Sequence, residues 1–327
     1  MLDKYFPFYA LVFFTTLILT ALIEKRFIPY LKIKAQQPIY NEGPSWHQAK
    51  SGTPTMGGVA FLSASIISLL PASVILLINE SFTSFISIIL TIGFALGNAA
   101  IGIIDDITKL RRKKNAGLSP TQKLFLQFVI CILFLTLRAW LLDTGTSLSF
   151  SFGKIELGFF FYPFSIFIML GLINSANLTD GIDGLASSVA FAVGISLFYI
   201  SASLIPELAF VSSSIVGATV GFLLFNIHPA KIFMGDAGSL LLGAIAVGCA
   251  FSLSNPLFVL IIGIVYIIEG FSVVIQVVSF KIWKKRVFKM APLHHHLEKC
   301  GFEENKICLI AMIATLIFSL FTPLLIP

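Results

Sequence analysis

Residues 85–106 read FISIILTIGFALGNAAIGIIDD, a mainly apolar run that ends in two adjacent aspartates. About 20 apolar residues in a helix are long enough to cross the hydrocarbon core of a bilayer. Nine further runs of similar character predict an all-α polytopic membrane protein with about ten transmembrane helices, folded as one integral membrane domain over residues 1–327. The predicted spans are residues 6–23, 57–78, 85–104, 124–142, 160–175, 185–201, 208–225, 238–253, 256–280 and 307–325.

The composition supports this fold class. The chain of 327 residues is 57% hydrophobic and 12% charged, whereas a soluble domain carries about a quarter charged residues. Its longest polar segments, about 25–35 residues, are too short for an independent soluble domain. The net charge of +6 comes from basic residues that flank apolar runs. It therefore indicates membrane topology and contact with anionic lipids, and not nucleic acid binding.

The basic residues fall on one side of the predicted membrane. Of the 22 Lys and Arg residues, 19 lie in segments 24–57, 105–123, 226–238 and 281–306. Basic loops mark the cytoplasmic side, so we expect a multi-pass plasma-membrane protein with its charged face in the cytoplasm. Because the number of spans is even, both termini are then outside. Arg138, near the outer end of its span, is expected to snorkel to the surface.

One predicted outer loop has a different pattern. In SLSFSF (147–152) polar and apolar residues alternate, Gly153-Lys154 follows, and then comes IEL (155–157). Alternation on both sides of a Gly-containing pair is typical of a β-hairpin. We predict a small hairpin on the outer surface, with no role in chemistry.

Two segments on the charged side carry paired carboxylates. Adjacent positions on a helix point about 100° apart, so one residue of the Asp105–Asp106 pair can face a metal ion while the other has a different role. The alternative is a pair of solvated charges at the helix end. The segment NLTDGIDG (177–184) places two carboxylates three residues apart beside glycines that allow close backbone approach. A plain turn is the alternative there, and the later ligands of a calcium loop are missing.

Two further segments complete the set. Asp236 lies between two glycines directly before an apolar run, where its simplest role would be a helix N-cap. The most basic loop contains PLHHHLE (292–298). Its three histidines could bind zinc together with Cys300, but this spacing matches no standard zinc site. Imidazoles that donate protons or contact phosphate explain the segment better.

Together, these carboxylates, histidines and basic loops indicate chemistry on an anionic substrate at one membrane face. Oxygen ligands of this kind suit Mg²⁺, which proteins hold with one or two carboxylates and the phosphates of a substrate. Phosphoryl transfer depends mainly on positioning and charge neutralisation. A site at the ends of apolar helices suits a substrate with a phosphate head and a lipid tail.

These motifs, in this order and with ten spans, resemble those of the phospho-N-acetylmuramoyl-pentapeptide-transferase family, a branch of the polyprenyl-phosphate phosphosugar transferases. The resemblance covers nearly the whole chain, and the three consecutive histidines are specific to the peptidoglycan branch. The segments that carry it are GTPTMGG (52–58), DD (105–106), NLTDGIDG (177–184), FMGDAGS (233–239) and PLHHHLE (292–298).

The resemblance implies an enzyme of peptidoglycan synthesis in the bacterial inner membrane. It would transfer phospho-MurNAc-pentapeptide from UDP-MurNAc-pentapeptide to undecaprenyl phosphate, giving lipid I and UMP, with Mg²⁺ required. The resemblance also implies a homodimer and inhibition by nucleoside antibiotics.

The same resemblance implies roles for individual residues. Asp236 and Asp106 correspond to the magnesium site, and Asp105 to the proposed base on the lipid phosphate. Asp183, with Gly181 and Ile182, corresponds to the uracil-binding segment, and Phe233 to the ring that stacks on uracil. The other site residues it implies are Lys50, Thr55, Lys123, Asn177, Asp180, Asn226, Gln276, His294, His295 and His296.

Two alternative functions and one intramembrane residue stay open. A transporter or lipid flippase would explain the spans, but it predicts ionisable residues distributed through the midplane. A transferase of GlcNAc-1-phosphate is closer, and the His segment disfavours it. Glu269-Gly270 lies within the long ninth run, where Glu269 is either functional or paired inside the bundle, and where the helix could bend or break.

Overall fold

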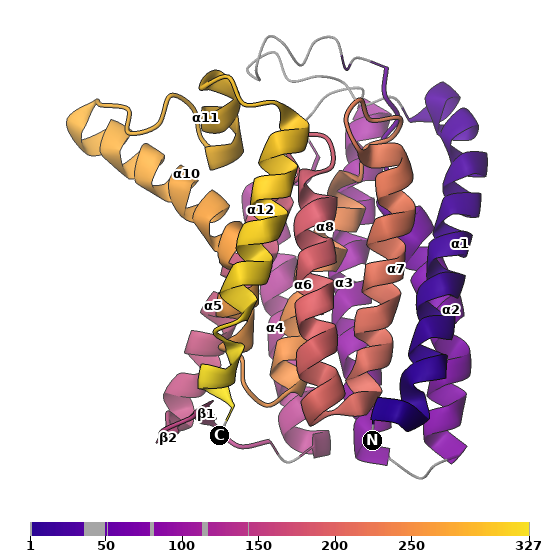
Figure 1. The fold of residues 1–327 in the computed structure, drawn as a ribbon. Coiled ribbons are helices and arrows are strands. Elements are labelled where there is room, and N and C mark those ends of the chain that lie inside the picture. The colour runs from indigo at the N-terminus through magenta and orange to yellow at the C-terminus, as the bar shows by residue number, and fades with distance from the viewer. Residues whose placement is uncertain are drawn as a thin grey trace.

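The computed structural model describes residues 2–35, 50, 52–78, 82–112, 117–142 and 144–326. Nearly all of its regular structure is helical, as predicted (Figure 1). The helices are α1 Leu2–Lys34, α2 Gly58–Ile78, α3 Phe82–Arg112, α4 Pro120–Leu142, α5 Phe161–Thr179, α6 Leu185–Leu204, α7 Ala209–Asn226, α8 Gly235–Ser252, α9 Phe258–Ile262, α10 Ile264–Trp283, α11 Leu293–Lys299 and α12 Glu304–Ser319.

Each predicted span coincides with a helix, and the ninth coincides with two. Among the described residues, eight helices are long and apolar enough to cross a membrane, and α2 contains a shorter apolar stretch, Gly58–Val74. The ninth run is divided at Gly263, between α9 and α10, and not at Glu269-Gly270. Since α10 is continuous through Glu269, this glutamate sits on an intact helix. The short helix α11 carries the three histidines, for which no helix was predicted.

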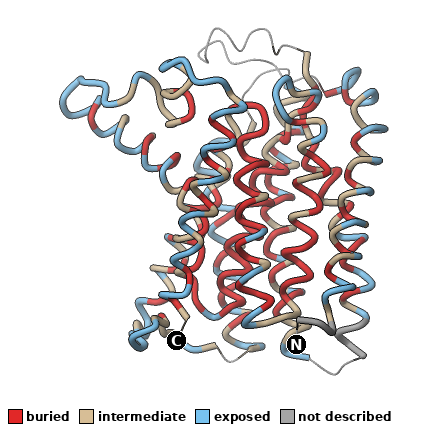
Figure 2. The backbone as a smooth tube through the Cα atoms, in the orientation of Figure 1, coloured by how far each residue is buried: buried red, intermediate tan, exposed pale blue. Residues whose placement is uncertain are grey.

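Helix α8 lies at the centre of the bundle, packed against α3, α5 and α2 (Figure 1). Among the helices able to span a membrane, its apolar residues are the most completely buried. Figure 2 shows this burial pattern, with buried backbone in the middle of the bundle and exposed backbone at its margins. A helix that is apolar on all sides can be buried on all sides. The N-terminus of α8 is therefore surrounded by the ends of the neighbouring helices.

Both chain termini lie at the same end of the bundle as the hairpin, and α11 lies at the opposite end (Figure 1). The charged segments 24–57 and 105–123 are only partly described, since residues 36–49, 51 and 113–116 lie outside the described ranges.

The predicted hairpin is present. Strands β1 Ser147–Phe150 and β2 Gly153–Glu156 pair antiparallel, with Ser147 opposite Glu156 and Phe150 opposite Gly153. The turn is therefore formed by residues 151–152, and Gly153 begins the second strand. The predicted element is confirmed, but its turn is two residues earlier than the glycine suggested.

Two charged side chains, Glu24 and Arg138, are buried in the bundle, and for Arg138 this contradicts the prediction. Helix α1 continues to Lys34, beyond the predicted end of the span at residue 23, and Glu24 is buried within the bundle. Arg138 is also buried, with an Nη2 atom 3.5 Å from the Ser254 hydroxyl, and does not snorkel. Helix packing decides burial at both positions.

Candidate active site

Asp105 and Asp106, on the last turns of α3, point to different partners, as adjacent helical positions require. The Asp105 carboxylate forms an ion pair with Lys109 (2.7 Å), and its Oδ1 accepts the backbone N–H of Leu118 (2.7 Å). The two oxygens of Asp106 accept the backbone N–H groups of Asp236 and Ala237, each at 3.1 Å. Both carboxylates are buried. They are not solvated charges at a helix end.

Asp236 is surrounded by polar groups from three other helices. Its Oδ2 forms ion pairs with Lys123 of α4 and, at 3.1 Å, with Lys109 of α3. Its Oδ1 accepts a hydrogen bond from Asn177 of α5 at 3.2 Å, and the same amide donates to Ser239 at 2.7 Å. Two ammonium groups on one carboxylate make this point strongly polar at the end of an apolar bundle. Three residues of the predicted site, Lys123, Asn177 and Asp236, are therefore in direct contact.

The N-cap interpretation of Asp236 is wrong. Helix α8 begins at Gly235, so Asp236 is already inside the helix and its side chain faces the lysines. The carboxylate that accepts N–H groups in the first turn of α8, those of Asp236 and Ala237, is that of Asp106. Gly235 has φ +74°, and a β-carbon there would lie 2.6 Å from the Asp106 carboxylate. A residue without a side chain is therefore needed for this contact.

The three aspartates form a group that could hold a metal ion. Asp105, Asp106 and Asp236 each offer an oxygen, and these oxygens lie within 4.8 Å of one another. A donor set made only of carboxylate oxygens matches the preference of Mg²⁺. The residues therefore fit the predicted metal, with Lys109 and Lys123 as neighbouring cations.

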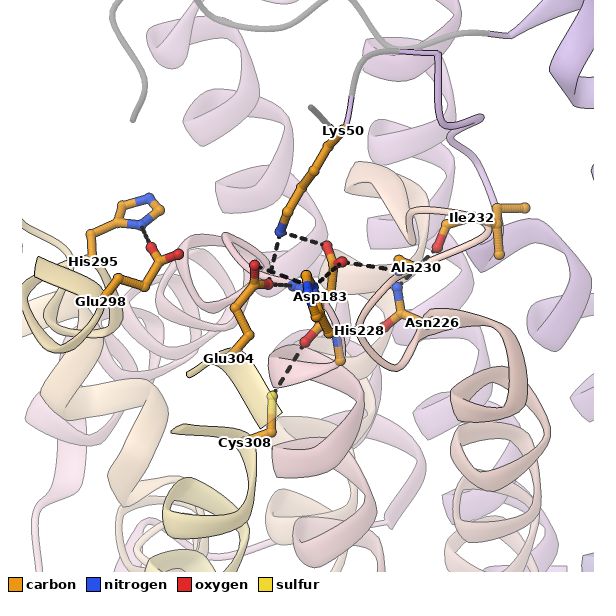
Figure 3. Close-up of polar contacts among 11 residues, drawn as sticks. Lys50, Asp183, Asn226, His228, Ala230, Ile232, His295, Glu298, Glu304 and Cys308 are labelled. Carbon is orange, nitrogen blue, oxygen red and sulfur yellow. Dashed lines mark hydrogen bonds and ion pairs between the residues drawn. The ribbon is translucent and has the colours of Figure 1, made fainter. Parts of the chain in front are cut away.

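A second polar cluster forms around Asp183, in the turn between α5 and α6 (Figure 3). Asp183 Oδ1 lies 2.8 Å from the Lys50 ammonium, and its Oδ2 lies 3.0 Å from both His228 Nδ1 and the Ala230 backbone nitrogen. Glu304, at the start of α12, also pairs with Lys50, at 2.7 Å. The cluster joins four segments that are remote in sequence. One oxygen or nitrogen from each of Asp183, His228 and Glu304 lies within 4.8 Å of the others.

Asn226 fixes this turn to the segment that precedes α8. Its Oδ1 accepts hydrogen bonds from the Gly184 backbone (3.2 Å) and the Ser187 hydroxyl (2.9 Å), while its Nδ2 donates to the Ile232 carbonyl (2.9 Å). One buried amide thus connects the uracil-binding segment predicted at 181–183 with the residue before Phe233. Asn226 contributes by positioning these two segments.

The segment around Phe233 is tied to the start of α2. The Phe233 N–H donates to the Pro54 carbonyl at 2.8 Å, and its carbonyl accepts the Gly57 N–H at 3.0 Å. The buried Thr55 lies between these points, and its N–H donates to the Ala35 carbonyl at 3.0 Å. The half-buried Phe233 ring is therefore carried on a backbone with hydrogen bonds on both sides.

His294 points inward from α11 and pairs with Glu269. The His294 ring Nδ1 lies 3.0 Å from Glu269 Oε2, and its backbone N–H also faces this carboxylate, at 3.2 Å. The other ring nitrogen, Nε2, is buried and has no hydrogen-bond partner among the described residues. It faces Gly181, where an added β-carbon would lie 2.1 Å from it. Glu269 is thus paired inside the bundle, through a residue of the predicted site.

The other two histidines have different partners. His295 Nδ1 lies 2.6 Å from Glu298, one turn along α11. His296 accepts the Lys289 N–H at 3.1 Å, and its Nε2 lies 3.7 Å from the Cys300 sulfur. The three imidazoles therefore do not converge on Cys300, and the possible zinc site drawn from this segment is not formed. Gln276 is also apart from the aspartates, because it is bound to the backbone of residues 287–288.

Asp180 lies in the same turn as Asp183, between α5 and α6. Burial raises the pKa of Asp180 from 3.8 to about 8, with smaller contributions from the negative charges of Asp236 and Asp106. This carboxyl is therefore largely protonated at neutral pH. A neutral Asp180 limits the negative charge that collects beside the three aspartates.

Sequence reasoning missed several residues that contact the predicted site, among them Lys109, His228 and Glu304. Lys109 lies four residues after Asp105, a spacing that brings side chains together on one helix and could have revealed it. His228 lies within the charged segment 226–238, which also contains Asp236. Glu304 is 121 residues from Asp183 in sequence, and no local pattern connects the two.

Comparison with known proteins identifies the family. Residues 86–254 match Glycosyl transferase family 4, and residues 50–62 match phospho-N-acetylmuramoyl-pentapeptide-transferase signature 1. The chain is 42% identical to the phospho-N-acetylmuramoyl-pentapeptide-transferase of Thermoanaerobacter sp. (strain X514) over 89% of this chain and 90% of the relative. It is 42% identical to that of Halalkalibacterium halodurans over 93% of each chain, and 41% identical to that of Clostridium perfringens (strain 13 / Type A) over 92% of this chain and 93% of the relative. The chain therefore belongs to the phospho-N-acetylmuramoyl-pentapeptide-transferase family, and is a phosphosugar transferase built from apolar membrane helices.

Proposed function

We propose that this enzyme transfers phospho-MurNAc-pentapeptide from UDP-MurNAc-pentapeptide to undecaprenyl phosphate, with Mg²⁺ as cofactor. A phosphate oxygen of the lipid attacks the sugar-linked phosphorus of the UDP-sugar. The bond from that phosphorus to the bridging oxygen breaks, and UMP leaves. The products are lipid I and UMP. The names of the relatives and the polar site at one end of an apolar bundle support this reaction.

The contact of Asp236 with two lysines and Asn177 is the observation that carries the proposal. Phosphoryl transfer between two anionic substrates needs fixed positive charge at the reacting phosphorus. The ammonium groups of Lys109 and Lys123 meet at Asp236 Oδ2 and provide such charge where the apolar helices end. Asp236 holds both lysines in place.

Asp106 and Asp236 would hold the magnesium ion, which would offset the charge of the pyrophosphate and make UMP a better leaving group. Asp106 would keep its second function, because its carboxylate also fixes the N-terminus of α8. Asp105 is almost fully buried, at 1% exposure, and positions Lys109. A role as base on the lipid phosphate would require one of its oxygens to leave its present partner, the Leu118 N–H at Oδ1 or the Lys109 ammonium at Oδ2.

The nucleotide would bind at the turn that contains Gly181, Ile182 and Asp183, with Phe233 as a stacking platform. Asn226 supports this assignment, since it connects the two segments. Both donor and acceptor face the cytoplasm in this proposal, at the end of the bundle opposite the termini (Figure 1). The membrane is the inner membrane of a bacterium, and the basic loops follow the positive-inside rule.

One assay tests the reaction and its nearest alternative. Purified enzyme in detergent is given undecaprenyl phosphate, Mg²⁺ and either UDP-MurNAc-pentapeptide or UDP-GlcNAc, and UMP and lipid product are measured. We expect turnover with the muramoyl substrate and its loss when Mg²⁺ is chelated. Turnover with UDP-GlcNAc alone would reassign the enzyme to GlcNAc-1-phosphate transfer. Turnover that persists in chelator would remove the metal from the proposal.

A further inference from the structure

We propose that Glu304, the first residue of α12, is a positioning residue of the nucleotide site. It holds the Asp183 segment and the Lys50 ammonium in the arrangement that receives the uridine nucleotide. The inference rests on the proposed function, because that function assigns the nucleotide to this turn.

A single oxygen of Glu304 binds two different parts of the site (Figure 3). Glu304 Oε2 accepts the Asp183 backbone N–H at 2.8 Å and lies 2.7 Å from the Lys50 ammonium. The Glu304 side chain is only 10% exposed, so water competes weakly for either contact. This carboxylate therefore restrains the backbone of the turn and a side chain from the segment before α2 together.

A second residue of α12, Cys308, binds the backbone carbonyl oxygen of Asp183. The Cys308 thiol donates to the Asp183 carbonyl at 3.3 Å (Figure 3). Residues four apart lie on the same face of a helix. From this one face of α12, Glu304 accepts the Asp183 N–H and Cys308 donates to the Asp183 carbonyl. Gly181 and Ile182 immediately precede this fixed point. Their backbone orientation consequently depends on α12.

The charges explain why a carboxylate is suited to this position. Lys50 lies between two carboxylates, at 2.8 Å from Asp183 and 2.7 Å from Glu304. His228 Nδ1 is 3.0 Å from Asp183 and 3.4 Å from Glu304. Removal of one partner from a partly buried ionic group leaves the others uncompensated. Without Glu304, Lys50 would keep a single carboxylate and Asp183 would lose the acceptor for its N–H.

Glu304 can be removed without removing the packing of its helix. Helix α12 packs against α6, and its buried residues are Ile307, Cys308, Ala311 and Thr315. Glu304 lies beyond this interface, at the end of the helix. Its neighbour Glu303 is exposed and provides a control with the same charge.

The experiment compares Glu304→Ala and Glu304→Gln with Glu303→Gln in the full-length protein in detergent. We expect the Kd of UMP and the KM of UDP-MurNAc-pentapeptide to rise about tenfold in Glu304→Ala. The rise should be smaller in Glu304→Gln, whose amide oxygen can still accept the Asp183 N–H. Neither constant should change in Glu303→Gln, and the KM of undecaprenyl phosphate should stay within about twofold of wild type in all three.

Amide hydrogen exchange of residues 180–185 tests the positioning directly and does not depend on the nucleotide. Glu304→Ala should exchange faster there than wild type, whereas Glu303→Gln should not. Equal exchange and equal UMP affinity in wild type and both Glu304 variants would overturn the inference. If Glu304→Ala fails to fold, the isosteric Glu304→Gln decides the outcome. A wild-type enzyme that binds no uridine nucleotide would instead overturn the proposed function, while the exchange rates would still show whether Glu304 holds the turn.

Discussion

Asp106 Oδ1 accepts the backbone N–H of Asp236 at 3.1 Å, although the two residues are 130 positions apart in sequence. The two aspartates thereby divide two tasks. Asp106 fixes the N-terminus of α8, and Asp236 points its carboxylate at Lys109 and Lys123. Replacement of each should consequently have a different effect.

Asp236→Asn should lower turnover on the order of 10²–10³-fold while the protein remains folded. The change removes the negative charge that pairs with Lys109 and Lys123. The same charge is part of the proposed metal site. Turnover as a function of Mg²⁺ concentration and thermal unfolding in detergent are the measurements. Near wild-type turnover at low Mg²⁺ would exclude Asp236 as a metal ligand.

Asp106→Asn should destabilise the protein more than Asp236→Asn does. An asparagine offers one acceptor oxygen to the two backbone N–H groups of Asp236 and Ala237. One buried hydrogen bond is therefore lost, and the NH₂ group of the asparagine faces a backbone N–H. Such a loss costs about 1–3 kcal/mol. The unfolding temperatures of the two variants are measured under the same conditions. A lower unfolding temperature for Asp236→Asn than for Asp106→Asn would contradict the prediction.

Gly181→Ala should remove most activity, because the new β-carbon would lie 2.1 Å from Nε2 of the buried His294. The ring is held on its other side by Glu269 and cannot retreat without losing that pair. Gly171→Ala is the matched control, since no atom lies within 4 Å of a β-carbon at that position. Turnover and unfolding temperature of both variants are measured. Equal activities would show that the His294 ring moves freely.

The stability of the protein should fall as the pH rises towards 8, in part through Asp180. The pKa of Asp180 is about 8 in the folded protein, whereas the ordinary pKa of an aspartate is 3.8. Between these values the folded state holds a proton that the unfolded state has released, so each rise in pH favours unfolding. The effect cannot exceed about 1.4 kcal/mol per pH unit. Thermal unfolding from pH 5 to 9 should show a shallower decline in Asp180→Asn; parallel curves would contradict the assignment.

Phe233→Ala should weaken UMP binding by one to two orders of magnitude, because an aromatic platform contributes about 1–3 kcal/mol per stacked base. The backbone of residue 233 is held by Pro54 and Gly57, so the truncation should leave the segment in place. Titration with UMP compares this variant with Phe302→Ala, an exposed control. Equal affinities for wild type and Phe233→Ala would remove this ring from the nucleotide site, as would an unchanged KM for the UDP-sugar.

The sequence by itself determined the helical class, the approximate positions of the long apolar helices, the hairpin near residues 147–157 and the segments that carry the polar residues. These features are local. A span is recognised from its own apolar run, and alternation within a few residues indicates strands. Adjacent aspartates on a helix must also diverge, which the partners of Asp105 and Asp106 confirm.

Only the tertiary structure decided which groups meet. It placed Asp106 at the N-terminus of α8, Glu304 at the backbone of Asp183, and Glu269 beside His294. It also buried Glu24, and it buried Arg138, which was expected to snorkel to the surface. Such contacts join helices that are far apart in the chain, and side-chain packing sets them. No periodicity within a single segment records which distant helix will be its neighbour.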